Sequence, residues 1–167
     1  MMDVYYDVPL VIQARNPICW VASMAMIESW WTKSSVGVGK YTGGFDPSSS
    51  CIPNPASDVW DFQNRMAGFS FYPVYPDGPM TLNGLGSLLG QFGPLLLFHN
   101  LEHAPWGAGA KGAHAVVITG VTGGSGGWIW INNPWGSKDL AAPASTSIQC
   151  AVWPASSSFS LYWGYFP

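Results

Sequence analysis

The stretch from residue 13 to residue 31, QARNPICWVASMAMIESWW, constrains the fold more than any other part of the chain. Pro17 stands just ahead of a segment that contains neither Pro nor Gly. Apolar residues in this segment recur at intervals of four, three and four, as on one face of an α-helix: Trp20, Met24, Ile27 and Trp31. We therefore predict a buried helix from about residue 19 to residue 33, with Cys19 at or just before its first turn.

The position of Cys19 has a chemical consequence. A thiol at the start of a helix faces unpaired N–H groups and the positive end of the macrodipole, which favour the thiolate and lower the pKa. Gln13, six residues upstream, can supply a side-chain amide to the oxyanion of a tetrahedral intermediate, beside the N–H of the nucleophile. Free cysteines are nevertheless often inert packing in a core, so the helix position alone does not establish catalysis.

Two β-branched and aromatic segments, residues 113–121 and 128–131, flank the sequence TGGSGG and form the clearest predicted hairpin. If the turn is centred on the first two glycines, antiparallel pairing sets His114 directly opposite Asn133. Cross-strand neighbours have Cβ atoms about 4.5–5.5 Å apart, within reach of a hydrogen bond between imidazole and amide. A slip of one residue in the register would put Asn132 there instead.

The hairpin therefore offers what a nucleophilic sulfur needs. A base must stay close to it, and a third group must orient that base. His114 can act as the base, and an Asn can hold its tautomer by accepting from the imidazole N–H. Each residue alone has an ordinary structural explanation, but Gln13, Cys19, His114 and Asn133 together indicate a catalytic set for acyl transfer.

Other constellations are weaker. His99 and His103 are four residues apart and could hold a metal on a helix, but Pro94 and Pro105 argue against a helix, and no third ligand is evident. We predict no metal and no other cofactor. The chain has three cysteines, an odd number. A disulfide between Cys51 and Cys150 would leave Cys19 free, and two reduced cysteines are at least as consistent with the sequence.

These motifs resemble the papain-like cysteine peptidases. In that family a Gln precedes the nucleophile by the same interval, and a Cys-Trp pair, here Cys19-Trp20, opens the central helix. Their histidine heads a strand in a context like residues 113–117, AHAVV. Their orienting Asn opens Asn-Ser-Trp-Gly, which residues 133–136, NPWG, replace here. The resemblance implies that Trp135 packs over the bond between Asn133 and His114.

A closer resemblance is to the small bacterial branch related to the peptidases that clip double-glycine leaders. There a segment like residues 7–13, DVPLVIQ, leads in, and an Ala-rich or Met-rich helix follows. The chain departs from this branch at two points, because many members have Cys-Gly at the nucleophile and Asp-Pro-Trp at the orienting residue. Here Cys19-Trp20 and Asn133 stand at those positions.

The resemblance implies an α+β fold in which a helical part carrying Cys19 packs on a C-terminal antiparallel sheet carrying His114 and Asn133. The length of 167 residues fits one domain, residues 1–167. Its helical part is predicted at about residues 13–93 and its sheet part at about residues 94–167. Thr81 is predicted to cap a helix, and residues 95–98 form a buried strand.

The composition of the chain limits which classes of partner it is expected to bind. Charged residues make up only 9% of the chain, and six basic residues scattered singly form no patch for nucleic acid or an anionic membrane. No apolar run approaches the about 20 residues of a membrane span. The start, Met1-Met2-Asp3, lacks the regions of a signal peptide. The location is thus left open between the cell interior, a signal-independent export route and a trimmed chain.

The function predicted from these residues is hydrolysis of an amide bond in a peptide or protein substrate. The family branch and the missing signal also suggest a bacterial secreted effector or toxin domain, neutralised by a cognate inhibitor or immunity protein. One alternative is a deamidase or transglutaminase-type acyl transferase on the same residues. Another is a catalytically inactive module that binds ligands in an aromatic groove, since the chain has ten tryptophans.

Overall fold

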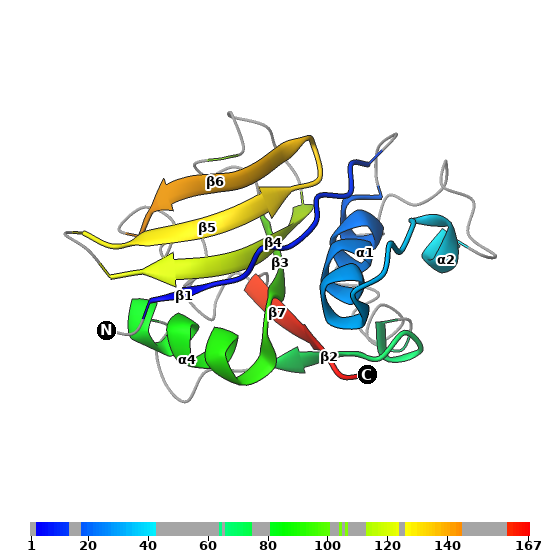
Figure 1. The fold of residues 1–167 in the computed structure, drawn as a ribbon, viewed down its shortest axis with the longest axis horizontal. Coiled ribbons are helices and arrows are strands. Elements are labelled where there is room, and N and C mark those ends of the chain that lie inside the picture. The colour runs from blue at the N-terminus through cyan, green and yellow to red at the C-terminus, as the bar shows by residue number, and fades with distance from the viewer. Residues whose placement is uncertain are drawn as a thin grey trace.

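The computed structural model describes residues 3–13, 18–42, 64, 66–74, 81–100, 104, 106, 113–123, 126–144 and 160–167. Its centre is a sheet of seven antiparallel strands in which the path runs β2-β7-β3-β4-β5-β6, and β1 pairs with β4 beside this path (Figure 1). The strands are β1 (Val4–Tyr5), β2 (Phe71–Val74), β3 (Leu95–Asn100), β4 (Ala113–Thr122), β5 (Trp128–Asn133), β6 (Ser137–Pro143) and β7 (Ser160–Tyr165). The helices are α1 (Cys19–Thr32), α2 (Gly39–Thr42) and α4 (Leu82–Phe92).

Helices α1 and α4 pack on opposite faces of the central strands. Along β3, Leu95 and Leu97 belong to the apolar cluster under α4, whereas Leu96 and Phe98 belong to the cluster under α1. Successive side chains of a strand point to opposite faces, so both faces of β3 are covered. Figure 1 shows the two helices against different parts of the twisted sheet. The predicted α+β fold, with helix α1 packed on an antiparallel sheet, is confirmed.

Helix α1 is enclosed by the protein on nearly all sides. Every residue from Cys19 to Ser29 is buried, including the small and polar ones on the face opposite the predicted apolar stripe. The helix ends at Lys33, which adopts a left-handed conformation with φ 53°. The predicted buried helix of about residues 19–33 is therefore present as α1.

Helix α4 begins directly after Thr81, the residue predicted to cap it. The Thr81 hydroxyl accepts a hydrogen bond from the Gly84 N–H at 3.0 Å, which satisfies one donor of the first turn. The glycines within the helix lower its intrinsic propensity, so its stability comes from tertiary burial. Leu85 and Leu89 are fully buried in the cluster shared with β3, β4 and β5.

The predicted hairpin is present, but its predicted register is wrong. Val117 pairs with Asn132 rather than with Trp130, an offset of two residues. The reason lies at the turn, where Thr122 pairs with Trp128 and closes a longer loop than the one centred on the first two glycines, an offset of three residues. A register shift between Ile118 and Gly120 reduces the offset to two in the rest of β4. An offset of two keeps the side chains of this part of β4 on their predicted face, so His114 and Asn133 still share one face of the sheet, now as diagonal neighbours.

The division into a helical part and a sheet part is less sharp than predicted. Strands β1 and β2 come from the first half of the chain and join the same sheet as β7, whose register with β2 pairs Phe71 with Tyr165. Two predictions lie outside the described residues: the redox state of Cys51 and Cys150, and the role of His103. Within the described residues, no helix is both long and apolar enough to cross a membrane.

Strand β1 lies so close to Gly120 that no side chain fits between them. A Cβ atom at Gly120 would lie 2.4 Å from the Val4 carbonyl oxygen and 2.9 Å from the Tyr5 Cα, both of which are backbone atoms. We expect Gly120→Ala to lower the free energy of unfolding by about 2 kcal/mol, since a packed backbone cannot move aside cheaply. Urea unfolding measures this change. In the control variant Gly37→Ala, where nothing lies within 4 Å, the change should stay below about 0.5 kcal/mol.

Candidate active site

Cys19 is the first residue of α1, and its sulfur lies against the start of β4. The backbone N–H groups of Ala115, of Trp20 and of Cys19 itself lie close enough to the sulfur to stabilise its thiolate form. Only 6% of the residue is exposed. Because Ala115 directly follows His114, the helix start and the histidine strand meet at this sulfur.

His114 lies on β4, and its ring contacts the last residue of β5, Asn133, and Trp135 in the β5–β6 connection. Its Nε2 lies 3.0 Å from the Asn133 Oδ1. The indole of Trp135 lies over the imidazole, with ring centroids 4.2 Å apart and an interplanar angle of 31°. His114 and Asn133 are buried, whereas Trp135 is 43% exposed, so its indole separates the bond between them from solvent.

The contacts of Asn133 define the tautomer of His114. Its Oδ1 also accepts the backbone N–H of Trp135 at 3.1 Å, which identifies this atom as the oxygen of the amide. An oxygen can only accept, so the Nε2 of His114 must carry the proton when it bonds to Asn133. In the neutral imidazole the Nδ1 is then the basic nitrogen.

The neighbouring Asn132, which a one-residue slip would have placed beside His114, has different partners. It is fully buried, and its Nδ2 donates to the Val8 carbonyl at 2.8 Å. Its Oδ1 accepts the Asp139 N–H at 2.9 Å. Of the two asparagines, only Asn133 hydrogen-bonds to His114 in the structure.

Gln13 reaches the same region from the segment that leads into α1. Its backbone N–H donates to the Pro134 carbonyl at 2.9 Å, so the residue lies next to the Asn133–Trp135 connection. Its side chain is half-buried, and Ile12 beside it is 59% exposed. The four residues singled out in the sequence thus come from three separate segments that converge at one end of the sheet.

Burial is the largest cause of the pKa shifts of Cys19 and His114. It raises the pKa of the Cys19 thiol to about 11 and outweighs the backbone hydrogen bonds at the sulfur, which lower the pKa. Burial also lowers the pKa of His114, although the hydrogen bond to Asn133 acts in the opposite direction. The lowered thiol pKa expected from the helix terminus is therefore wrong for the free protein. Both shifts favour a resting state with a neutral thiol and a neutral imidazole.

This resting state predicts how Cys19 reacts with iodoacetamide, which alkylates the thiolate. From about pH 6 to pH 9 the rate should rise about tenfold per pH unit without a plateau, because the thiol pKa lies above this range. Peptide mass spectrometry localises the label to Cys19. The chain unfolded in urea serves as control and should level off near the ordinary cysteine pKa of about 8.5. A rate that stays constant across neutral pH would instead reveal a preformed thiolate and imidazolium pair.

His99, weighed in the sequence as a metal ligand, lies beside the site. It is the cross-strand partner of His114, and the two ring centroids lie 6.1 Å apart. The Trp106 indole N–H donates to its Nε2 at 2.9 Å, so this nitrogen is already engaged by the protein. No group of three metal-ligating side chains occurs among the described residues.

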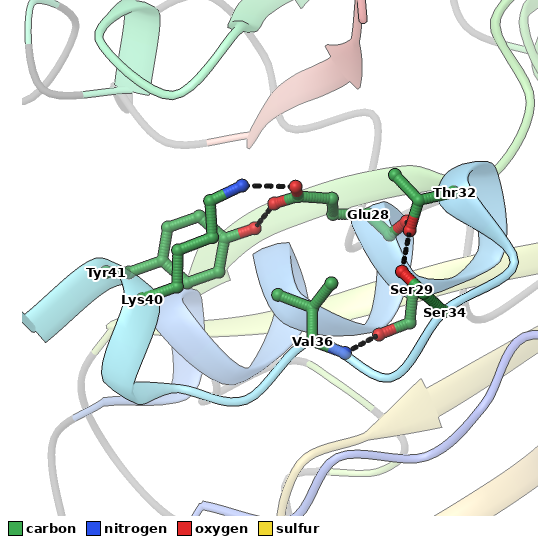
Figure 2. A network of polar contacts seen from close by, with 7 residues as sticks. All are labelled: Glu28, Ser29, Thr32, Ser34, Val36, Lys40 and Tyr41. Carbon is green, nitrogen blue, oxygen red and sulfur yellow. Dashed lines mark hydrogen bonds and ion pairs between the residues drawn. The ribbon is translucent and has the colours of Figure 1, made fainter.

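A second polar network holds the C-terminal end of helix α1 (Figure 2). The buried carboxylate of Glu28 accepts from the Lys40 ammonium and from the Tyr41 hydroxyl. The Ser29 hydroxyl accepts the Val36 N–H at 2.9 Å. Glu28 is nine residues beyond Cys19, about 13 Å along the helix, so this network anchors α1 without touching the sulfur.

Comparisons with known proteins bear on the family and the fold of the chain. The sequence model of a family described as "Papain-like cysteine protease AvrRpt2" matches residues 2–147. Among solved structures, the chain is similar to a protein from Bacillus anthracis described as a C39-like peptidase, with a TM-score of 0.64 and 15% sequence identity. That likeness covers 100% of this chain and 98% of the other, and at this identity it concerns the fold alone. No curated protein sequence matches the chain significantly.

Proposed function

The chain belongs to the papain-like cysteine protease family, and from the geometry of its site we propose that Cys19 is the nucleophile of this cysteine peptidase. The observation that supports the proposal is the approach of the Ala115 backbone to the sulfur, since Ala115 directly follows His114 on β4. His114 in turn bonds to Asn133 at 3.0 Å. These contacts support the roles of nucleophile for Cys19, base for His114 and orienting group for Asn133.

The proposed reaction starts when a substrate amide lies against the sulfur. The Nδ1 of His114 takes the thiol proton as the sulfur attacks the carbonyl carbon, and Asn133 keeps the imidazole oriented throughout. His114 then gives the proton to the leaving amine, and a thioester to Cys19 remains. Water attacks the thioester with His114 again as base, which releases the acid and restores the thiol.

Charge develops on the carbonyl oxygen during both attacks. We assign its stabilisation to the Gln13 side-chain amide and the Cys19 backbone N–H, which lies against the sulfur. The bond from the Gln13 N–H to the Pro134 carbonyl holds the residue beside the other groups of the site. Gln13 is thus a proposed catalytic residue, although it takes no part in proton transfer.

Gln13→Ala should therefore lower kcat by about 10²- to 10³-fold and leave KM nearly unchanged, because the oxyanion forms only in the transition state. Steady-state kinetics on a fluorogenic peptide measure both constants. Gln13→Glu is a matched variant that has the same shape but lacks the donor, and it should lose as much. A kcat within about threefold of the wild type in both variants would remove Gln13 from the mechanism.

The chemical outcome is tested on a peptide library or a cell lysate, with the wild-type protein compared with Cys19→Ala by mass spectrometry. New termini that require Cys19 identify hydrolysis. A change of Gln to Glu without chain cleavage identifies deamidation, and new cross-linked or transferred products identify acyl transfer. If no product depends on Cys19, the domain is an inactive binding module and the proposal fails.

We also propose, from the family resemblance alone, that the peptidase acts as a bacterial secreted effector or toxin with a cognate inhibitor or immunity protein. Expression of the wild-type protein in host cells should then impair growth, and expression of Cys19→Ala should not. Equal growth of both strains at equal protein levels would contradict the effector role and leave the peptidase assignment intact.

A further inference from the structure

Asn132 precedes the proposed orienting residue but serves a different part of the site. Its side chain is fully buried, donates to the Val8 carbonyl at 2.8 Å and accepts the Asp139 N–H at 2.9 Å. The two partners fix which end of the amide is nitrogen and which is oxygen. One side chain therefore joins β5 to β6 and to the segment that leads to Gln13.

A bulge between β5 and β6 allows the hydrogen bond between the Asp139 N–H and Asn132. The pairing of β5 with β6 shifts between Ile131 and Asn133, so two residues of β6 lie opposite Asn132. Asp139 is one of the two and has φ 53°, a left-handed conformation that Asp tolerates at a bulge. Asn132 supplies the acceptor for the backbone N–H at this bulge.

The other bond lies on the path from β1 to Gln13. Up to Tyr6, whose N–H donates to the Thr119 carbonyl at 2.8 Å, the segment is attached to β4. An exposed ion pair then joins the Asp7 carboxylate to Lys138 of β6 at 2.6 Å. The next hydrogen bonds from the backbone of the segment go to β5 and the connection after it, from Asn132 to the Val8 carbonyl and from the Gln13 N–H to Pro134. These two backbone bonds set the segment relative to the strand that carries Asn133.

We propose that Asn132 is a positioning residue that acts through Gln13. By anchoring the Val8 carbonyl on β5, it holds the Gln13 amide at the distance from Cys19 that the oxyanion requires. Misplacement of a catalytic group by about 1 Å can cost up to about 100-fold in rate, so such an anchor affects catalysis without contact to substrate. The inference rests on the proposed oxyanion role of Gln13.

A double-mutant cycle of Asn132→Ala and Gln13→Ala tests the inference. Rates are expressed per reactive Cys19, counted by alkylation, so that inactive protein does not contribute. In the wild-type background Asn132→Ala should lower kcat about tenfold with KM within about twofold. In the Gln13→Ala background the same change should cost less than about twofold, because the group that it positions is gone. An equal loss in both backgrounds would overturn the inference.

Two further measurements keep the interpretation unambiguous. Ile129→Ala removes a buried side chain from the same strand but from the cluster under α4, and its kcat should stay within about twofold of the wild type. If Ile129→Ala lowered kcat as much as Asn132→Ala, general loosening of β5 would replace the inference. The single variant Gln13→Ala tests the oxyanion role of Gln13. A failure of that assignment is therefore distinguished from a failure of the inference about Asn132. Should Asn132→Ala not fold, Asn132→Ser takes its place in the cycle, and loss of folding in both would make Asn132 purely structural.

Discussion

Cys19→Ala is expected to lower peptide hydrolysis at least about 10⁴-fold. The change removes the sulfur that forms the thioester, and neither His114 nor Gln13 can take its place as a nucleophile. The fold should persist, because one buried sulfur is replaced by a methyl group in a helix that suits Ala. We expect Tm to shift by less than about 4 °C. Activity on a fluorogenic peptide and thermal unfolding by circular dichroism check the two statements together.

Cys19→Ser separates the need for a sulfur from the need for a polar group. Its hydroxyl can accept the same backbone hydrogen bonds as the sulfur, so the local geometry is preserved. A hydroxyl is a much weaker nucleophile, and the neutral His114 must remove its proton against a far larger pKa difference. The loss should therefore be nearly as large as for Ala. The proposed mechanism would be contradicted if Cys19→Ala retained more than about a tenth of the wild-type rate of peptide hydrolysis.

The sequence was sufficient to predict the elements that follow local rules. Helix α1 follows from the spacing of its apolar residues, and the cap of α4 follows from Thr81. The hairpin of β4 and β5 follows from its β-branched residues and glycines, and the contact between His114 and Asn133 is present although the register differs. Side-chain direction along a strand repeats every two residues, so a register error of two leaves this pair on one face.

What could not be predicted depends on contacts between distant segments. The bond from Asn132 to Val8 joins residues 124 positions apart, and nothing in the local sequence distinguishes Asn132 from Asn133. The effect of burial on Cys19 was missed for a related reason. The helix terminus is visible in the sequence, but the strand that covers the sulfur is not, and burial outweighs the terminus. Strand β7 likewise fits between β2 and β3 only after the sheet is assembled.

The second large effect is expected at His114. His114→Ala should lower kcat/KM by about 10⁴-fold, since the thiol pKa of about 11 leaves almost no thiolate at neutral pH without a base. Kinetics per alkylated Cys19 measure the loss. His99→Gln is the matched control, because His99 is the buried cross-strand neighbour and Gln can still accept the Trp106 indole N–H. This control should lose less than about tenfold.

The half-exposed Trp135 gives the same prediction a second test. His114→Ala leaves a cavity beneath an indole that is 43% exposed, and a small heterocycle can enter such a space when the indole swings outward. Added imidazole should therefore restore part of the activity of His114→Ala, with a pH dependence that follows the free imidazole, and none of the activity of Cys19→Ala. If His99→Gln were the more damaging variant, or if imidazole rescued it instead, the base would be His99, and the tautomer derived from Asn133 would have no catalytic meaning.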